Sequence, residues 1–391
     1  MAKIILFTGK GGVGKTVMAA ATSLAAAKRG YKTVVMSTDP AHSLGDSLDL
    51  RLGPEPIEIM PNLWAQESDI IYNLEKFYGR IQGWLIAMLA WQGLSEVSAE
   101  ELTVFPGMDE LASLIWLYHH QKSGRYDVVI VDCAPTGEAL RLLTLPEIAK
   151  WWMDKFLPMG KWVAHPLMHF IYGMPLPERK AYDDIKDLRW QLEEIQKLLT
   201  DPEITRIRLV TNPEKMVIRE TQRAYSDLNL YSYPIDLLIC NKIIPEEADG
   251  RYWEEWKKSQ DNYLKLIEEC FSPLPMLKIP LLRHEVVGVE ALEEIADLLY
   301  GKDDPTRTFF EGKPIILEQE NSDYLLLLEL PFIEKEDISL HKIGDELVVR
   351  IGNLKRNILL PLVLQKREPI KAELKEGHLQ IRFKESETVK A

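Results

Sequence analysis

Short apolar runs alternate with longer helical segments through the first three hundred residues. The runs of strand length cover residues 3–8, 32–37, 127–132, 235–241 and 276–280, and an alanine-rich helix is predicted over residues 17–29. Apolar strands that alternate with helices are typical of a parallel sheet covered on both faces. The pattern predicts an α/β fold that binds its ligands at the carboxyl ends of the strands.

The pattern changes after residue 301. Residues 302–312 are predicted to be a linker, and only short strands follow, at residues 315–318, 324–330, 338–342, 346–351, 354–360, 370–374 and 378–384. Seven short strands separated by turn residues indicate a β-sandwich. We therefore expect two domains, residues 1–301 and residues 313–385.

Two stretches inside the first domain are predicted to be helical inserts, at about residues 71–121 and 150–200. Residues 71–121 and 150–177 are also rich in bulky apolar side chains. Seven of the ten tryptophans lie between Trp84 and Trp190. One interpretation is an ordinary helical core, and the other is a groove for a hydrophobic segment, because flexible methionines suit a promiscuous apolar surface. The candidate groove residues are Trp84, Met88, Trp91, Trp152, Met159, Leu167 and Met168.

A phosphate-binding loop joins the first strand to the first helix. Its glycines let backbone N–H groups point at phosphate oxygens, and the following helix directs its positive end at them. We expect Lys15 to reach the β- and γ-phosphates and the Thr16 hydroxyl to bind Mg²⁺ directly. The predicted nucleotide-binding residues of this loop are Gly9, Lys10, Gly11, Gly12, Val13, Gly14, Lys15, Thr16 and Val17.

Lys10 is an additional cation in this loop. One interpretation is an exposed loop residue. The other is a charge that serves a second nucleotide, because Lys10 lies too near the start of the loop to serve its own nucleotide well.

Charge and cysteine content narrow the function classes. The net charge of −13 and the lack of a basic tail argue against nucleic acid as the main partner. The three cysteines, Cys133, Cys240 and Cys270, are too widely separated for an iron–sulfur cluster or a disulfide framework. The longest uncharged apolar stretch, residues 81–95, is too short to span a bilayer, and the chain starts directly with a core strand. We expect a cytoplasmic protein that is not stably inserted in a membrane.

Three motifs follow one another along the chain. They are the loop at residues 9–16 with its second lysine, Ser-Thr-Asp-Pro-Ala-His-Ser-Leu-Gly-Asp at residues 37–46 and Asp-Cys-Ala-Pro-Thr-Gly at residues 132–137. Together they resemble the arsenite-pump ATPase (ArsA) family, which includes the eukaryotic ATPases that target tail-anchored membrane proteins. The resemblance covers roughly residues 1–300. It implies an ATPase that uses Mg²⁺ and works as a homodimer.

The resemblance also implies roles for single residues. Lys10 would cross the dimer interface to the partner's nucleotide and act like an arginine finger in trans. Asp39 would orient or deprotonate the attacking water. Asp132 would hold Mg²⁺ through water, and Asp46 could share this shell. Residues 135–137 would form the second switch, which senses the γ-phosphate.

Asn241 follows an apolar strand. In the family an asparagine at this place hydrogen-bonds adenine, and the alternative is a turn residue at the strand end.

Two departures from the family's patterns bear on its subclasses. Residues 242–278 contain only Cys270, so the zinc-binding Cys-x-x-Cys of the animal and fungal targeting ATPases is missing, and we expect no zinc. There is no cysteine between Cys133 and Cys240, which argues against activation by arsenite. A metalloid-pump subunit and a partition or membrane-switch ATPase remain alternative functions.

The C-terminal domain resembles the α-crystallin domain of small heat-shock proteins. Its Ala-Glu-Leu-Lys-Glu-Gly-His-Leu at residues 372–379 approaches that family's Ala-x-x-x-x-Gly-Val-Leu signature, with His378 in place of valine. The sequence as a whole therefore predicts a dimeric ATP hydrolase that binds and releases a hydrophobic protein client, either a transmembrane helix or a misfolded protein.

Overall fold

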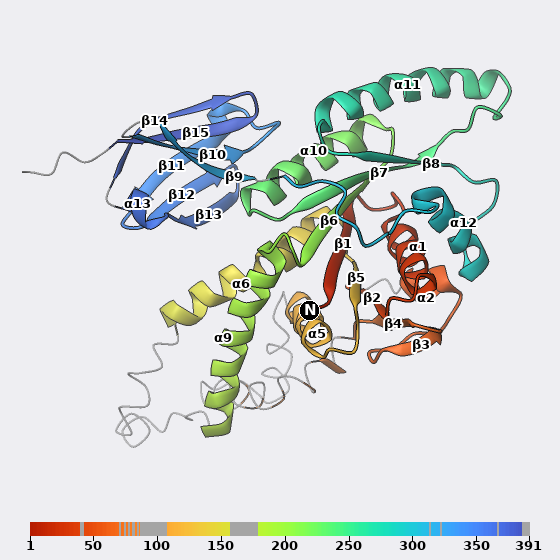
Figure 1. Cartoon of the computed structure of the whole chain (residues 1–391), viewed down its shortest axis with the longest axis horizontal. Helices are drawn as coiled ribbons and strands as arrows, with labels where there is room; N and C mark the ends of the chain where they lie inside the picture. The colour runs from red at the N-terminus through yellow and green to blue at the C-terminus, as the bar shows by residue number, and fades with distance from the viewer. Residues whose placement is uncertain are drawn as a thin grey trace, which may run out of the picture. The chain divides into compact units, whose positions relative to one another are not determined.

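The chain forms two compact units (Figure 1). The first comprises Met1–Thr205 with Leu282–Arg307, and the second comprises Arg206–Leu281 with Thr308–Ala391. The structure, a computed structural model, describes residues 1–39, 43–69, 108–156, 179–312, 314–320, 323–365 and 367–384, and single positions at 72, 73, 76, 79, 83 and 86.

A mostly parallel sheet forms the core of the first unit. Its strands β1 (Lys3–Gly9), β2 (Thr33–Ser37), β3 (Ile57–Met60), β4 (Leu63–Glu67) and β5 (Val128–Asp132) lie in the order β3-β4-β2-β5-β1. Only β3 is antiparallel to its neighbour. The interior residues of β1, β2 and β5 are buried, as expected of apolar strands covered on both faces.

Helices flank this sheet. They are α1 (Lys15–Lys28), α2 (Ser43–Leu48), α5 (Met108–Lys122), α6 (Thr136–Phe156), α9 (Arg179–Thr200) and α12 (Gly288–Tyr300). Helix α1 is buried almost all round because α2 and α12 cover it as well, and the hydroxyls of Thr22 and Tyr300 lie 2.7 Å apart. Helices α6 and α9 run side by side (Figure 1).

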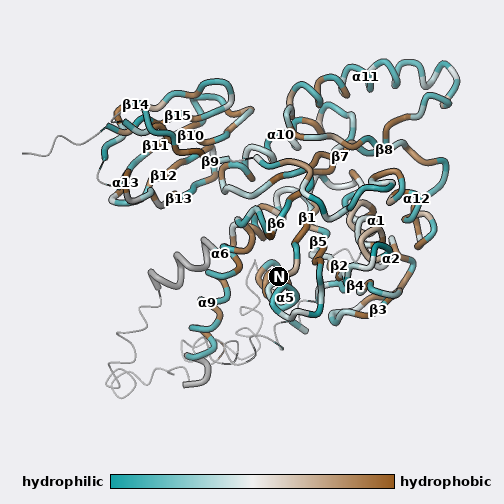
Figure 2. The backbone as a smooth tube through the Cα atoms, in the orientation of Figure 1, coloured by the Kyte–Doolittle hydropathy of each residue, from teal (hydrophilic) through white to brown (hydrophobic). Residues whose placement is uncertain are grey.

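The second unit contains three parallel strands and a β-sandwich. The parallel strands are β6 (Thr205–Thr211), β7 (Ile235–Ile243) and β8 (Met276–Pro280), accompanied by α10 (Lys215–Leu230) and α11 (Arg251–Phe271). The tube coloured by hydropathy is hydrophobic along much of β1 in the first unit and mostly hydrophilic along α11 (Figure 2).

The sandwich has two antiparallel sheets, β14-β15-β10-β9 and β11-β12-β13. Its strands are β9 (Ile315–Glu320), β10 (Asp323–Glu329), β11 (Ile338–Ile343), β12 (Glu346–Ile351), β13 (Leu354–Leu359), β14 (Glu368–Lys375) and β15 (His378–Lys384). A short 3-10 helix, η1 (Lys335–Asp337), and a short α-helix, α13 (Leu362–Gln365), lie between strands. The predicted α/β fold with a C-terminal β-sandwich is confirmed.

Three strands, β3, β4 and β6, were not predicted from the sequence. In β6 the arginines at positions 206 and 208 interrupt the apolar run. Arg208 is nevertheless fully buried, where its guanidinium lies 3.5 Å from the Asp236 carboxylate and over the ring of Phe309. The ion pair with Asp236, a residue of another strand, therefore allows the charged Arg208 side chain to be buried within the sheet.

Candidate nucleotide-binding and catalytic site

The phosphate loop has the backbone that its glycines predict. Gly12 and Gly14 have φ values of 81° and 99°, a left-handed region in which a side chain would be strained. Helix α1 begins directly after Gly14, with no side-chain cap and no acidic residue in its first turn. Its first N–H groups and its positive end are thus available to an anion.

Two lysines lie in this loop. Lys15 is buried, and its ammonium donates a hydrogen bond to the Lys10 carbonyl at 3.3 Å, so its side chain bends back over the loop. Lys10 itself is half-exposed. The two lysines are therefore not equivalent, since only Lys15 is held against the loop by burial.

The catalytic candidates Asp39 and Asp132 gather around the hydroxyl of Ser37. This hydroxyl donates to Asp132 Oδ2 at 3.3 Å and accepts from the Asp39 amide at 3.2 Å. The pairing of β2 with β5 places Ser37 opposite Asp132. Sequence reasoning gave no role to Ser37, although a polar residue at the end of an apolar strand is a usable signal.

Burial, with a smaller contribution from the neighbouring Asp39, raises the pKa of Asp132 to about 7. The Thr16 hydroxyl, the Lys15 ammonium and the Ser37 hydroxyl act in the opposite direction. An added cation would stabilise the carboxylate in this environment.

The donor set fits Mg²⁺. Asp132 Oδ1 is buried and makes no hydrogen bond within the described chain, and the Thr16 hydroxyl acts on the same carboxyl. Hydroxyl and carboxylate oxygens are the ligands that Mg²⁺ prefers. In the described residues, this site included, no group of three or more histidine, cysteine or acidic side chains is placed to hold a metal.

Helix α2 brings Ser43 to the phosphate loop rather than Asp46. The hydroxyls of Ser43 and Thr16 lie 3.2 Å apart, whereas Asp46 is exposed. The helix is fixed by Glu67, whose carboxylate accepts a hydrogen bond from the Gly45 amide at 2.7 Å. A share of Asp46 in the magnesium shell stays a prediction.

The predicted second switch begins α6. Its Pro135 approaches the phosphate loop, since a Cβ added to Gly11 would lie 4.0 Å from Pro135 Cγ. Asn241 is buried near the end of β7 in the second unit, and the next residue, Lys242, has a φ of 57°. The role of Asn241 in base recognition also stays a prediction.

The groove candidates lie largely outside the described residues. This applies to Trp84, Met88, Trp91, Met159, Leu167 and Met168. The backbone of Trp152 is part of α6, but its side chain is not described. In the helices that the structure does describe, none is both long and apolar enough to cross a bilayer.

Two of the three cysteines, Cys133 and Cys240, are poor thiolate sources. Burial raises the pKa of the Cys133 thiol far above its usual range and that of Cys240 to about 12. Cys270 is half-buried and accepts a hydrogen bond from Gln222.

A glycine-rich loop between a parallel strand and a buried helix, with a buried aspartate beside it, defines a phosphate-loop nucleoside triphosphatase. The chain belongs to the ArsA ATPase family: the family model described as anion-transporting ATPase matches residues 2–301. A second model, described as an HSP20-like domain found in ArsA, matches residues 321–383. The protein is therefore an ATPase.

Relatives named as ATPases include arsenical pump-driving and GET3 proteins. A putative arsenical pump-driving ATPase 1 of Aquifex aeolicus is 39% identical over 97% of this chain and 99% of its own length. A putative arsenical pump-driving ATPase of Chlorobaculum tepidum is 40% identical over 97% and 96%. The ATPase GET3B of Arabidopsis thaliana is 31% identical over 76% of this chain and 79% of its own length.

Proposed function

We propose that the chain is a homodimeric, Mg²⁺-dependent ATPase in which ATP binding and hydrolysis control the capture and release of a hydrophobic protein segment. We assign the ATPase domain to residues 1–301, a linker to residues 302–312 and the β-sandwich to residues 313–385. The protein would act in the cytoplasm and would need neither zinc nor an iron–sulfur cluster.

The position of Lys10 carries the dimer proposal. Lys15 is buried and bonded to the Lys10 carbonyl, which supports a role at the phosphates of its own nucleotide. A second ammonium on the same loop is best used by a nucleotide bound to another copy of the chain. There it would stabilise the charge that develops during phosphoryl transfer.

The geometry around Ser37 supports the proposed catalytic roles. Asp39 is held through its amide near Asp132, where it would orient the attacking water. Bound Mg²⁺, held by Thr16 and through water by Asp132, would neutralise charge on the β- and γ-phosphates. Lys15 would bind these phosphates, and Asn241 would bind adenine.

The Lys10→Ala variant tests the dimer proposal. We expect kcat to fall roughly 10²-fold or more, because trans-acting cations contribute that much or more to phosphoryl transfer. Mixing Lys10→Ala with Asp39→Asn subunits should restore part of the activity, because one of the two sites then has an intact Asp39 and an intact Lys10 from the partner. Full activity of Lys10→Ala alone would refute the role in trans.

The client proposal is tested with a purified protein that has a single C-terminal transmembrane helix. We expect ATP, but not ADP, to support a stable complex in gel filtration. Deletion of the transmembrane helix from the client should abolish the complex. Equal binding with both nucleotides would contradict nucleotide control.

A metalloid-pump subunit is the second candidate, favoured by the names of the relatives that match most of the chain. The raised pKa values of Cys133 and Cys240 argue against it, because a thiolate is the form that binds a soft metalloid. Stimulation of ATP hydrolysis by arsenite would decide for the pump.

A further inference from the structure

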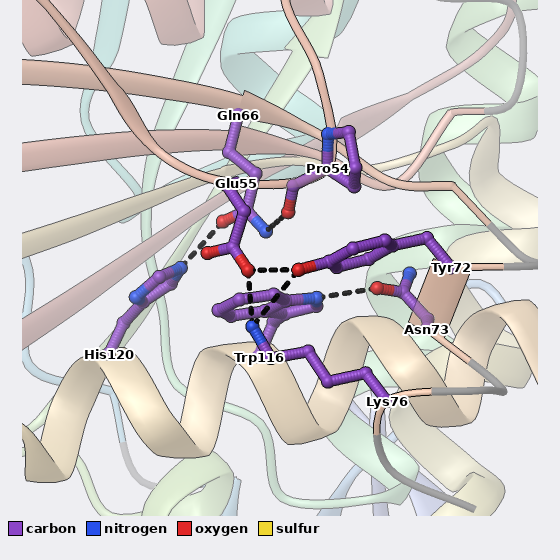
Figure 3. Close-up of polar contacts among 8 residues, drawn as sticks. All are labelled: Pro54, Glu55, Gln66, Tyr72, Asn73, Lys76, Trp116 and His120. Atoms are coloured by element: carbon purple, nitrogen blue, oxygen red, sulfur yellow. Dashed lines mark hydrogen bonds and ion pairs between the residues drawn. The ribbon is translucent and has the colours of Figure 1, made fainter. Parts of the chain in front are cut away.

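An aromatic and polar cluster lies where the first apolar insert begins (Figure 3). We call Glu55, Asn73, Lys76, Trp116 and His120 the Trp116 cluster. The Lys76 ammonium lies 4.4 Å from the centre of a Trp116 ring and pairs with the Glu55 carboxylate, and the His120 ring stacks on Trp116 at 5.2 Å. None of these residues belongs to the nucleotide site described above.

A continuous series of hydrogen bonds joins this cluster to the catalytic carboxylates. The Ser37 hydroxyl donates to Asp132, and the Ser37 carbonyl accepts from the Ser68 amide at 3.3 Å. The Ser68 hydroxyl accepts from the Asn73 side-chain amide at 3.0 Å, and Asn73 Oδ1 accepts from Trp116 Nε1 at 2.7 Å. The path runs from the end of β2 through the end of β4 to helix α5.

Burial makes these bonds costly to break. Ser37, Asn73 and Asp132 are fully buried, and Trp116 is 6% exposed. Leaving one buried donor or acceptor without its partner costs about 1–3 kcal/mol. When Ser37 is displaced, a concerted displacement of Asn73 therefore costs less free energy than breaking one of these hydrogen bonds.

Asn73 lies at the start of the first apolar insert, which the sequence predicts from about residue 71. The amides of Tyr72 and Asn73 donate to the Asp69 side chain and carbonyl, at 2.9 and 3.0 Å, so the first turn is fixed at the end of β4. The described positions 72, 73, 76, 79, 83 and 86 are all helical. Movement at Asn73 would therefore also displace the first helical turn, at Tyr72 and Asn73, where the first apolar insert starts.

We propose that Ser68, Asn73 and Trp116 are positioning residues that couple the nucleotide state of the Asp39–Asp132 site to the first apolar insert. The inference rests on the proposed function and adds the route by which ATP changes the affinity for the client. Coupling between two ligands is reciprocal, so client binding changes the affinity for ATP by the same factor.

The Trp116→Phe variant tests the coupling, because it keeps an aromatic ring and removes the N–H that Asn73 accepts. The probe is a fluorescent 20-residue leucine-rich helical peptide, whose Kd is measured with ADP and with a non-hydrolysable ATP analogue. We expect the two Kd values to differ about 10-fold in the wild type, within the usual range of allosteric coupling, and less than about 3-fold in Trp116→Phe. The kcat for ATP should stay within about 3-fold of wild type, since no group of the nucleotide site is removed.

Two further variants separate coupling from simple destabilisation. Ser123→Ala is the control, because it deletes a hydroxyl that is bonded to the His120 carbonyl of the same helix but lies outside the path. Ser68→Ala should reduce the ratio of the peptide Kd values measured with ADP and with the ATP analogue. Combining it with Trp116→Phe should reduce this ratio little further, because both residues belong to the same series of hydrogen bonds.

The outcomes distinguish the two proposals. An undiminished nucleotide effect in Trp116→Phe would overturn the coupling route and leave the proposed function intact. A wild type that binds the peptide equally with both nucleotides would overturn both. A loss of the effect in Ser123→Ala as well would show that general destabilisation, rather than the path, is responsible.

Discussion

At the scale of single residues, the Asp39–Asp132 pair shows how burial prepares a catalytic site. Asp132 lies at the end of a buried strand, where burial and the Asp39 charge both raise its pKa. Bound Mg²⁺ stabilises a carboxylate that burial has destabilised more than it stabilises a solvated carboxylate. The motif supplies the residue types, and burial at the strand end supplies the electrostatics.

Replacing Asp39 by Asn should separate binding from hydrolysis. We expect ATP affinity within a few-fold of wild type and a kcat reduced roughly 10²- to 10⁴-fold, the usual contribution of a positioned acid or base. Single-turnover hydrolysis and equilibrium nucleotide binding measure the two effects. Asp46→Asn serves as the comparison, because Asp46 is exposed on α2. Unchanged turnover in Asp39→Asn would remove Asp39 from the mechanism.

At the scale of elements, the contact between β4 and α5 depends on a neutral histidine. Gln66 donates its amide to the Pro54 carbonyl at 2.6 Å, so its oxygen accepts from His120 Nε2, also at 2.6 Å. This assigns the proton of the neutral imidazole to Nε2. Burial lowers the pKa of His120 to about 4, helped by His119, Arg125 and Lys76 and opposed by Glu55.

This histidine should contribute to acid sensitivity. Below pH 6.5 the unfolded chain protonates His120 while the folded chain does not, so the free energy of unfolding falls as the pH decreases toward 4. At pH 5 we expect a loss of up to about 2 kcal/mol from this residue. Urea unfolding at pH 7 and pH 5 should show a smaller loss in His120→Gln. His341→Gln, on the exposed side of β11, should behave like wild type.

The apolar inserts carry a prediction that depends on the sequence alone. Replacing Met159 or Leu167 by Asp should abolish capture of a transmembrane-helix client, because a charge in an apolar groove must be desolvated on binding. ATP hydrolysis and the thermal midpoint should change little if these side chains face a groove. Gel filtration with the purified client measures capture. Severe loss of stability in both variants would instead assign the two residues to a helical core.

At the scale of the second unit, the β-sandwich contacts α10 and the turn that follows it. The Tyr225 hydroxyl donates to the Glu329 carboxylate at 2.9 Å, and the rings of Tyr225, Phe271 and Phe332 pack together. Arg356 donates to the Leu230 carbonyl and to the Ser232 hydroxyl. The sandwich is thus held by specific polar contacts in addition to the covalent connection.

Removing these contacts should loosen the sandwich without unfolding it. We expect the combined Arg356→Met and Phe332→Ser variant to be cleaved several-fold faster at residues 302–312 in limited proteolysis, because cleavage follows the population of the opened state. Arg350→Met is the matched control, since Arg350 is an exposed residue of β12. Equal cleavage rates in both variants would show that these contacts contribute little.

The sequence by itself determined the phosphate loop, most strands of the parallel sheet and all seven strands of the sandwich. These features depend on local chemistry: glycines permit left-handed backbone, and apolar runs bounded by turn residues form strands. Strand β6 was not predicted because Arg208 is a charged residue within an otherwise apolar run. Its burial depends on an ion pair with Asp236, which is 28 positions away in the sequence.

Tertiary structure alone brought Ser37 between the two aspartates that we propose act in catalysis, and joined Ser68 and Asn73 to Trp116. It also placed Ser43, rather than Asp46, beside Thr16. Such contacts link residues that are distant in the chain, and their energies depend on burial and alignment, which no local pattern specifies. The sequence therefore determined which chemistry the chain can perform, and the packing of β2, β4 and α5 decided which residues surround that chemistry.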